Sequence, residues 1–213
     1  MNEAKEAILA RIRQATGQTS EGDLAGQRTY HTTSSDLSEI ILDVFAERVL
    51  EYQAALTRID AQQLPASIAT ACTERGVKRL VIPADIPDAW LPPGIEVMRD
   101  EPPLSYADLD ASDGALSGCR LAIAQTGTIV LDGGARQGRR ALSLIPDLHF
   151  CIVEEGQIVG LVPEAISQLA GYRSQPITFI SGPSATSDIE LNRVEGVHGP
   201  RTLHVFVVLG ERR

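Results

Sequence analysis

The sequence has only three cysteines, an odd number. Cys72, Cys119 and Cys151 are far apart, and no two of them share a Cys-x-x-Cys spacing. A disulfide framework, a zinc site or an iron–sulfur cluster needs closely spaced cysteines or histidines, so we assign no metal and no cofactor to this chain. The cysteines are expected to be small buried hydrophobes.

Positive charge and long apolar runs are also scarce. The chain has 19 Lys and Arg against 28 Asp and Glu, a net charge of −9. Nucleic-acid binding needs clustered basic residues, so no nucleic-acid partner is expected. No segment reaches the roughly 18–20 apolar residues of a membrane span, and the first residues lack the apolar core of a signal peptide. We therefore expect no membrane span and a cytoplasmic location.

What is present is the composition of an ordinary globular protein, with 43% hydrophobic and 22% charged residues. Residues 2–14 have a helix-like apolar face, and a stretch rich in Gly, Thr and Ser follows to about Thr33. From Asp36 to Leu56 the apolar residues again follow helical spacing. We predict a helical N-terminal arm with a flexible linker over residues 1–56 and an α/β domain over residues 57–213.

Helices and strands alternate in the second part. Residues 64–75 read as a helix ended by Gly76, residues 77–82 as a buried strand, and residues 95–98 as another strand. Further strands are predicted at 149–153 and a helix at 162–169. His149, at the edge of its strand, is expected to be a satisfied structural histidine. This alternation predicts a mostly parallel sheet covered on both faces.

The segment 179–200 concentrates glycines, prolines and hydroxyls between two strand-like runs, 176–180 and 203–209. Gly182 and Pro183 break the first run, and Ser187 with Glu190 has the spacing of a capping box. Amide groups there, with the hydroxyls of Ser184, Thr186 and Ser187, would suit a phosphate or a carboxylate. The same residues also suit a purely local helix cap.

The end of this segment places a histidine in a sharply turned backbone. Gly196, Gly199 and the following proline favour a presented rather than a packed His198. Its ordinary pKa suits proton transfer. Asp188 and Glu190 are the other candidate acid–base groups, while a surface histidine without a task remains the alternative reading.

A second polar group interrupts the apolar run 121–132. Gln125, Thr126, Gly127 and Thr128 need hydrogen-bond partners, which are either backbone groups or a ligand. Two glycines and three arginines follow, in a pattern that matches no phosphate-loop spacing. Arg139 and Arg140 are the candidates for anion binding, whereas Arg136 is expected to serve surface solubility.

Three stretches together resemble a known family: AIAQTGTIVLDGG, RRALSLIPDLH and ISGPSATSDIELNRVEGVHGPRTLHVFVV. They resemble the LUD-domain family, in particular its lactate-utilisation C type, from about Leu80 onward. The resemblance implies a three-layer α/β/α sandwich similar to the NagB/RpiA/CoA-transferase-like fold. It also implies a role in oxidising L-lactate to pyruvate beside iron–sulfur partner proteins, which would hold the clusters.

One position departs from the family pattern. Members commonly have a glutamate before Thr-Gly-Thr, and this chain has Gln125. An amide cannot act as a carboxylate nucleophile or general base. The resemblance therefore implies a role more than a reaction, and whether the chain is an enzyme stays open.

Three hypotheses follow. The first is a subunit or accessory protein of an iron–sulfur complex that oxidises lactate, binding a small anion such as lactate or a phosphorylated compound. The second is a stand-alone enzyme, similar to a transferase, isomerase or cyclo-ligase, acting on a phosphorylated or CoA-linked anion. The third is a structural or regulatory module.

Overall fold

The computed structural model describes residues 2–16, 31–34, 40–172, 176–183 and 199–210. The chain forms two compact units, residues 1–31 and 32–213. In the first unit, helix α1 (Asn2–Thr16) follows the predicted helical arm. The apolar side chains of Ile8 and Ile12 are exposed on it.

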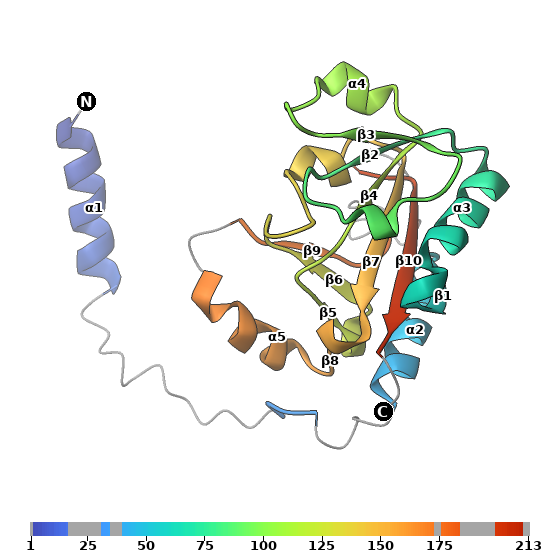
Figure 1. Cartoon of the computed structure of the whole chain (residues 1–213). Helices are drawn as coiled ribbons and strands as arrows, with labels where there is room; N and C mark the ends of the chain where they lie inside the picture. Colours follow the sequence, from blue (N-terminus) through green and yellow to red (C-terminus); the bar gives the residue numbers. More distant parts are fainter. Residues whose placement is uncertain (1, 17–30, 35–39, 173–175, 184–198, 211–213) are drawn as a thin grey trace. The chain divides into compact units, whose positions relative to one another are not determined.

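The second unit holds a sheet of six parallel strands in the order β1-β10-β7-β4-β2-β3 (Figure 1). These strands are β1 (Ala55–Asp60), β2 (Arg79–Ile82), β3 (Glu96–Arg99), β4 (Gly114–Ser117), β7 (Leu148–Glu154) and β10 (Thr202–Leu209). The central strands β4, β7 and β10 are almost completely buried. The predicted α/β class with a mostly parallel sheet is confirmed.

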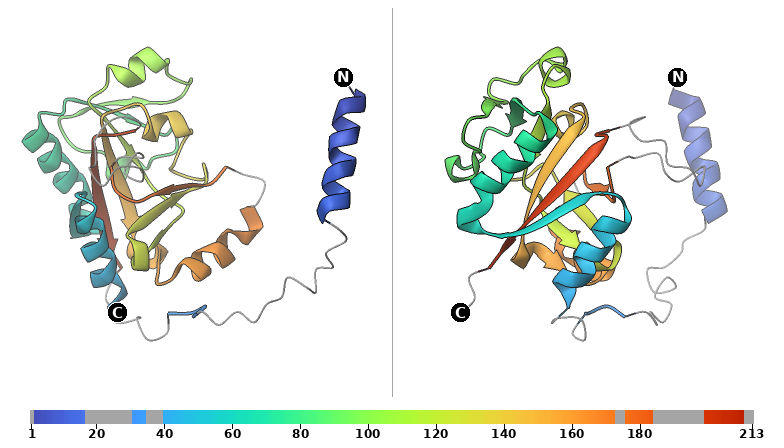
Figure 2. Two further views of the ribbon diagram at one scale, coloured as in Figure 1. Left: turned by 180° about the vertical axis from the view of Figure 1, so that it is seen from behind. Right: turned by 90° about the vertical axis from the view of Figure 1, so that its right-hand side faces the viewer.

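Helix α3 (Leu64–Arg75) covers one face of this sheet, as the views in Figure 2 show. Its Leu64 and Ile68 pack against Phe150 and Phe206 from the strands. The helix ends where Gly76 adopts φ +69, a left-handed conformation that glycine takes without a steric penalty. Both the bounds of this helix and its glycine stop were predicted.

The other face is covered by a second sheet, which the sequence analysis did not separate from the first. Its strand order is β8-β5-β6-β9, with β5 (Leu121–Ile123), β6 (Thr128–Leu131), β8 (Ile158–Val159) and β9 (Thr178–Ile180). Strand β6 runs antiparallel to both β5 and β9. Helix α5 (Val162–Leu169) packs on the outer side of this small sheet.

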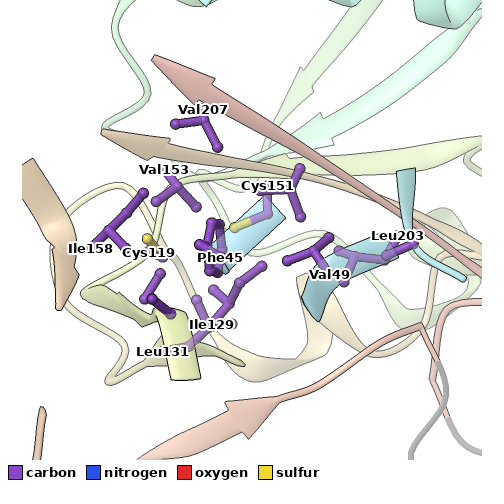
Figure 3. Packing of buried hydrophobic residues seen from close by; sticks show 14 residues of the cluster. Phe45, Val49, Cys119, Ile129, Leu131, Cys151, Val153, Ile158, Leu203 and Val207 are labelled. Atoms are coloured by element: carbon purple, nitrogen blue, oxygen red, sulfur yellow. The ribbon is translucent and has the colours of Figure 1, made fainter. Parts of the chain in front are cut away.

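Helix α2 (Ile41–Glu51) fills the space beside the two sheets. Figure 3 shows its Phe45 and Val49 among core side chains of both sheets, including Ile129 of β6 and Cys151 of β7. Helix α2 is part of the second unit, residues 32–213.

The predicted helix from Asp36 to Leu56 is wrong over its last five residues, 52–56. Residues 35–39 lie outside the described residues, and α2 ends at Glu51. Gln53 then takes φ +61, which turns the chain. Ala55 to Asp60 form β1, paired along its length with β10. Tertiary pairing overrides the helical spacing here, since a strand also buries alternate apolar residues.

Two smaller features complete the fold. Helix α4 (Tyr106–Asp110), which the sequence analysis did not predict, begins with a capping box between Ser105 and Asp108. All three cysteines are buried thiols, as predicted. Within the described residues, no helix is long and apolar enough to cross a membrane.

Candidate functional site

Two neighbouring cavities meet at the short 3₁₀ turn formed by Arg140–Ser143. The small cavity, of about 70 Å³, is lined by Arg140, Ser143, His149, Leu203 and residues 179–183, 199 and 200. The wide cavity, of about 600 Å³, is lined by Arg139, Arg140, Ser143, residues 131–134, Gln137, Gly138, Pro176 and Thr178. Arg140 and Ser143 belong to both.

The small cavity lies at the amino ends of two parallel strands. His149 is the second residue of β7 and is paired in register with Leu203, the second residue of β10. Open α/β sheets more often bind ligands at the carboxyl ends of their strands. The site therefore depends on the small sheet, because β9 and the loop after it supply the facing wall.

Arg140 presents a positive charge to both cavities. Its Nη1 donates to the carbonyl oxygen of Ser143 at 2.9 Å and to Ser143 Oγ at 2.8 Å. Within the described part of the chain, no carboxylate forms an ion pair with Arg140, and Nε and Nη2 make no hydrogen bond. Partial burial lowers the pKa of the guanidinium from its ordinary value. The free edge of the fork can receive a carboxylate or a phosphate.

His149 lines the small cavity and has only 1% of its surface exposed. Its Nε2 lies 2.8 Å from Ser117 Oγ at the end of β4. Burial, together with the positive charge of Arg140, lowers the pKa of His149 to about 4. The imidazole is therefore neutral at neutral pH and acts as a hydrogen-bonding group rather than as a cation.

A chain of hydroxyls leads from the polar group of the run 121–132 to the small cavity. Thr126 Oγ1 lies 2.7 Å from Thr128 Oγ1, which lies 2.8 Å from Ser181 Oγ. Ser181 lines the small cavity. Thr126 and Thr128 are thus satisfied by protein groups, and Thr128 acts on the cavity through Ser181.

Arg139 and Arg140, adjacent in sequence, have different partners. Arg139 donates from Nε and Nη2 to the carboxylate of Asp100, at 2.7 and 3.0 Å, and from Nη2 to the carbonyl of Leu104. Arg139 holds down the pKa of Asp100 despite the burial of that carboxylate. Its charge is already balanced, so Arg140 is the better placed of the two for an anion.

Arg136 was expected to be a surface residue that serves solubility. In the structure it contacts Glu154 and Trp90. Its Nη1 donates to Glu154 at 2.7 Å, and its guanidinium lies 4.9 Å from the ring centre of Trp90. Arg136, Glu154 and Trp90 line neither the small nor the wide cavity.

Gln125 and Gly127 do not line either cavity at Arg140. Gln125 Oε1 accepts a hydrogen bond of 3.5 Å from the backbone N–H of Val162. Gly127 has φ +59, and a Cβ there would come within 2.8 Å of the backbone of Arg48 in α2. Gly127 is needed for packing, and Gln125 with Thr126 lines a separate cavity beside Tyr52.

Gly182 and Gly199 both line the small cavity. They have φ +85 and +113, conformations that glycine adopts readily. The remaining predicted site residues lie outside the described residues, and their roles stay predictions: Ser184, Thr186, Ser187, Asp188, Glu190, Gly196 and His198.

Within the described residues, no cluster of three or more His, Cys, Asp or Glu side chains forms a metal site.

His149, Ser117 and Ser143 were missed as site residues. His149 and Ser117 are 32 positions apart and meet only because β4 and β7 are neighbours in the sheet. A polar residue within the buried run LHFCIV was the one available signal for His149. Nothing in the sequence distinguished Ser117 or Ser143.

Comparisons with known proteins agree with this architecture. A lactate utilization protein C from Deinococcus radiodurans is 55% identical over 170 residues, which cover 79% of each chain. A protein of the same name from Geobacillus kaustophilus is 32% identical over 130 residues, 57% of this chain and 54% of that relative.

A solved structure is also similar. The crystal structure of a DUF162 family protein from Deinococcus radiodurans has a TM-score of 0.69 and 48% identity, and covers 80% of this chain and 96% of that one. The sequence model of the LUD domain matches residues 2–208. The chain belongs to the LUD-domain family.

Proposed function

We propose that this chain works in lactate utilization and binds a small anionic ligand in the small cavity. The relatives named lactate utilization protein C support the role. One structural observation carries the binding: the guanidinium of Arg140 lines the small cavity, and no carboxylate among the described residues neutralises it. A positive charge with free donors in a concave site is a receptor for a carboxylate or a phosphate.

The wider role that we propose is that of a subunit or accessory protein of an iron–sulfur complex that oxidises L-lactate to pyruvate. The clusters would belong to partner proteins, and this chain would bind the small anion and contribute to the assembly. The spacing of its three buried cysteines supports that division of labour.

The alternative is a stand-alone enzyme that acts on a phosphorylated or CoA-linked anion. One observation supports it: the wide cavity adjoins the small one at Arg140, and its volume of about 600 Å³ lies in the usual range of ligand sites. A ligand with a long tail would place its anionic group at Arg140 and its tail in the wide cavity.

Isothermal titration calorimetry tests the binding directly. The full chain is titrated with L-lactate, pyruvate, inorganic phosphate and a CoA ester at constant ionic strength. Arg140→Gln removes charge-assisted hydrogen bonds worth about 1.5–3 kcal/mol each, so the dissociation constant of the bound anion should rise at least tenfold.

Arg201→Gln is the matched control, because it also removes one positive charge. Arg201 is 65% exposed and pairs only loosely, at 3.6 Å, with the exposed Asp147. Its substitution should leave binding within about twofold. Binding unaffected by Arg140→Gln, or equally weakened by both substitutions, contradicts the proposed site.

The cellular role is tested by deletion and complementation. Deletion should abolish growth on lactate, wild type should restore it, and Arg140→Gln should restore it poorly. Affinity purification of the tagged chain from its host should recover an iron–sulfur protein. Unchanged growth of the deletion strain on lactate would contradict the role.

A further inference from the structure

The two outer strands of the six-stranded sheet differ in how their free edges are protected. β3 has four residues, Glu96–Arg99, and prolines at positions 92, 93, 102 and 103 flank it. β1 has six residues, Ala55–Asp60, and no proline occurs between residues 40 and 64. Short edge strands and prolines are two of the means by which proteins prevent edge-to-edge pairing, because proline lacks the N–H that a new strand would use. β1 has neither.

Both faces of β1 are covered, so its outer edge is the part that faces outward. Leu56 packs against the core cluster of Phe45 in α2, and Ile59 belongs to the cluster of Ile68 in α3. One edge is paired with β10 over all six residues. Among the described residues no strand pairs with the other edge, and the right-hand view of Figure 2 shows β1 in front of the rest of the sheet. This edge presents backbone N–H and C=O groups to a further strand.

Arg58, the charged residue in the middle of β1, is held toward α2. Its guanidinium binds the carboxylate of Asp43 and, from Nη2 at 3.3 Å, the carbonyl oxygen of Leu42. A charged side chain across the edge is another means of protection, and Arg58 contacts α2 instead. Asp60, two positions further, projects from the same face because side chains alternate along a strand. One face of β1 thus carries a positive and a negative charge two positions apart.

We infer that the outer edge of β1 pairs antiparallel with β1 of a second copy of this chain, so that two six-stranded sheets join across a two-fold axis. Dimers with two-fold symmetry are the commonest homo-oligomers, and their interfaces use the same surface on both subunits. A second copy brings a strand of the same length with the same two charges. No residue of β1 lines the small or the wide cavity, so the inference goes beyond the proposed function and does not depend on it.

The charges of β1 favour one register of this pairing. With the two-fold axis at Ile59, Arg58 lies opposite Asp60 of the second copy, and symmetry repeats the pair on the other side of the axis. Opposite charges directly across an antiparallel pair are stabilising, and like charges are destabilising. An axis at Arg58 would place the two Arg58 side chains against each other, and an axis at Thr57 would place Arg58 opposite the uncharged Leu56. The axis at Ile59 is the one that pairs the charges.

Two measurements on the full chain test the inference. Sedimentation velocity between about 1 and 100 μM should show a monomer that converts to a dimer as the concentration rises. Hydrogen exchange at both ends of this range should show slower exchange of β1 amides in the dimer, because their outward N–H groups then donate to the second copy. The amides of β3 should exchange at the same rate at both concentrations, since that edge stays free.

Two arginine substitutions, one on each outer strand, form a matched pair. Arg58→Glu places like charges opposite Asp60 of the second copy, twice per dimer, and should raise the dimer dissociation constant at least about tenfold. Arg99→Glu is the control in β3, because the side chain of Arg99 is 34% exposed against 36% for Arg58, and each pairs with an aspartate. The control should leave the dissociation constant within about twofold. Circular dichroism checks the fold, and if Arg58→Glu does not fold, the hydrogen exchange of the wild-type chain decides.

A chain that stays monomeric over the whole concentration range overturns the inference. A dimer in which β1 amides exchange as fast as in the monomer also overturns it, as does a dimer that both substitutions weaken equally, because the copies then meet elsewhere. Anion binding is measured separately, and Arg58→Glu should bind the same anions as the wild type. Absence of the dimer therefore leaves the proposed anion site standing, and failure of the anion site leaves this inference standing.

Discussion

His149 and His204 make a comparison between two regions of the same sheet. They lie on the neighbouring strands β7 and β10, both are buried, and each has Nε2 2.8 Å from one hydroxyl, Ser117 Oγ or Thr57 Oγ1. Burial lowers the pKa of each to about 4. In residue type, burial and protonation the two are nearly equivalent.

Their surroundings separate them. The ring of His204 stacks on Phe206 with 4.2 Å between ring centres, and Phe150 contacts it edge-on, so its Nδ1 is closed off. His149 lines a cavity that also contains Arg140. A lowered histidine pKa alone therefore does not tell whether the histidine belongs to a binding site. What distinguishes His149 is the cavity that it lines together with Arg140, a cation that no carboxylate of the described residues neutralises.

The largest expected effect concerns both histidines together. Each is neutral in the folded chain with a pKa near 4 and should titrate near 6.5 when unfolded. Their contribution to the free energy of unfolding is therefore fully present above about pH 6.5 and is lost as the pH falls toward 4. The slope is about 1.4 kcal/mol per pH unit for each histidine.

Urea unfolding between pH 4 and pH 8 measures this slope. His149→Gln and His204→Gln should each lower the slope between pH 5 and pH 6.5, by about 1.4 kcal/mol per pH unit. A variant that leaves the slope unchanged shows that the fold does not keep its histidine neutral. The two histidines would then differ in protonation, contrary to the comparison above.

The next effect should separate the regions by stability. Phe206→Ala opens a void beside His204 and should lower the free energy of unfolding by about 3–5 kcal/mol, because Phe206 is fully buried. Phe179→Ala, in the wall of the small cavity, removes a side chain that is 48% exposed and should cost less than about 1 kcal/mol. Urea midpoints at equal slope check both values. Similar losses of stability in the two variants would contradict the distinction between the closed core around Phe206 and the open cavity at Phe179.

The smallest expected effect separates two adjacent arginines. Arg139→Gln leaves the buried carboxylate of Asp100 without its ion-pair partner and should destabilise the fold by about 1–3 kcal/mol. Arg140→Gln loses the hydrogen bonds to Ser143 but leaves no carboxylate without its ion-pair partner, so it should cost less stability than Arg139→Gln while weakening anion binding. Thermal unfolding and calorimetry on both variants measure the two quantities. A large stability loss in Arg140→Gln would identify it as a structural residue.

The regular parts of the fold were predictable because local signals determine them. Helix α3 has both its apolar face and its glycine stop in sequence, and the buried strands appear as continuous apolar runs. The small sheet was not separable, because β5 and β9 have three residues each and their partners are distant in sequence. The end of α2 was missed because the left-handed turn occurs at Gln53, a residue with no preference for it.

The site was predictable only where a residue type carries its own constraint. Gly182, Gly199 and Arg140 were selected as glycines of turned backbone and as a basic residue, and the structure brings them together at one cavity. His149 and Ser117 form a pair only through the order of strands in the sheet. Long-range juxtapositions of this kind have no trace in local sequence.

Nitrogen NMR of the histidine side chains tests the central claim most directly. The chain has four histidines, and His149→Gln assigns the resonances of interest. Before ligand is added, both His149 and His204 should be neutral imidazoles at pH 7, because their pKa values lie near 4. On addition of L-lactate, the nitrogen resonances of His149 should shift, because the ligand then occupies the cavity that His149 lines, and both nitrogens of His204 should stay unchanged. If L-lactate binds while the nitrogens of His149 do not respond, the ligand does not occupy the small cavity and this account is contradicted.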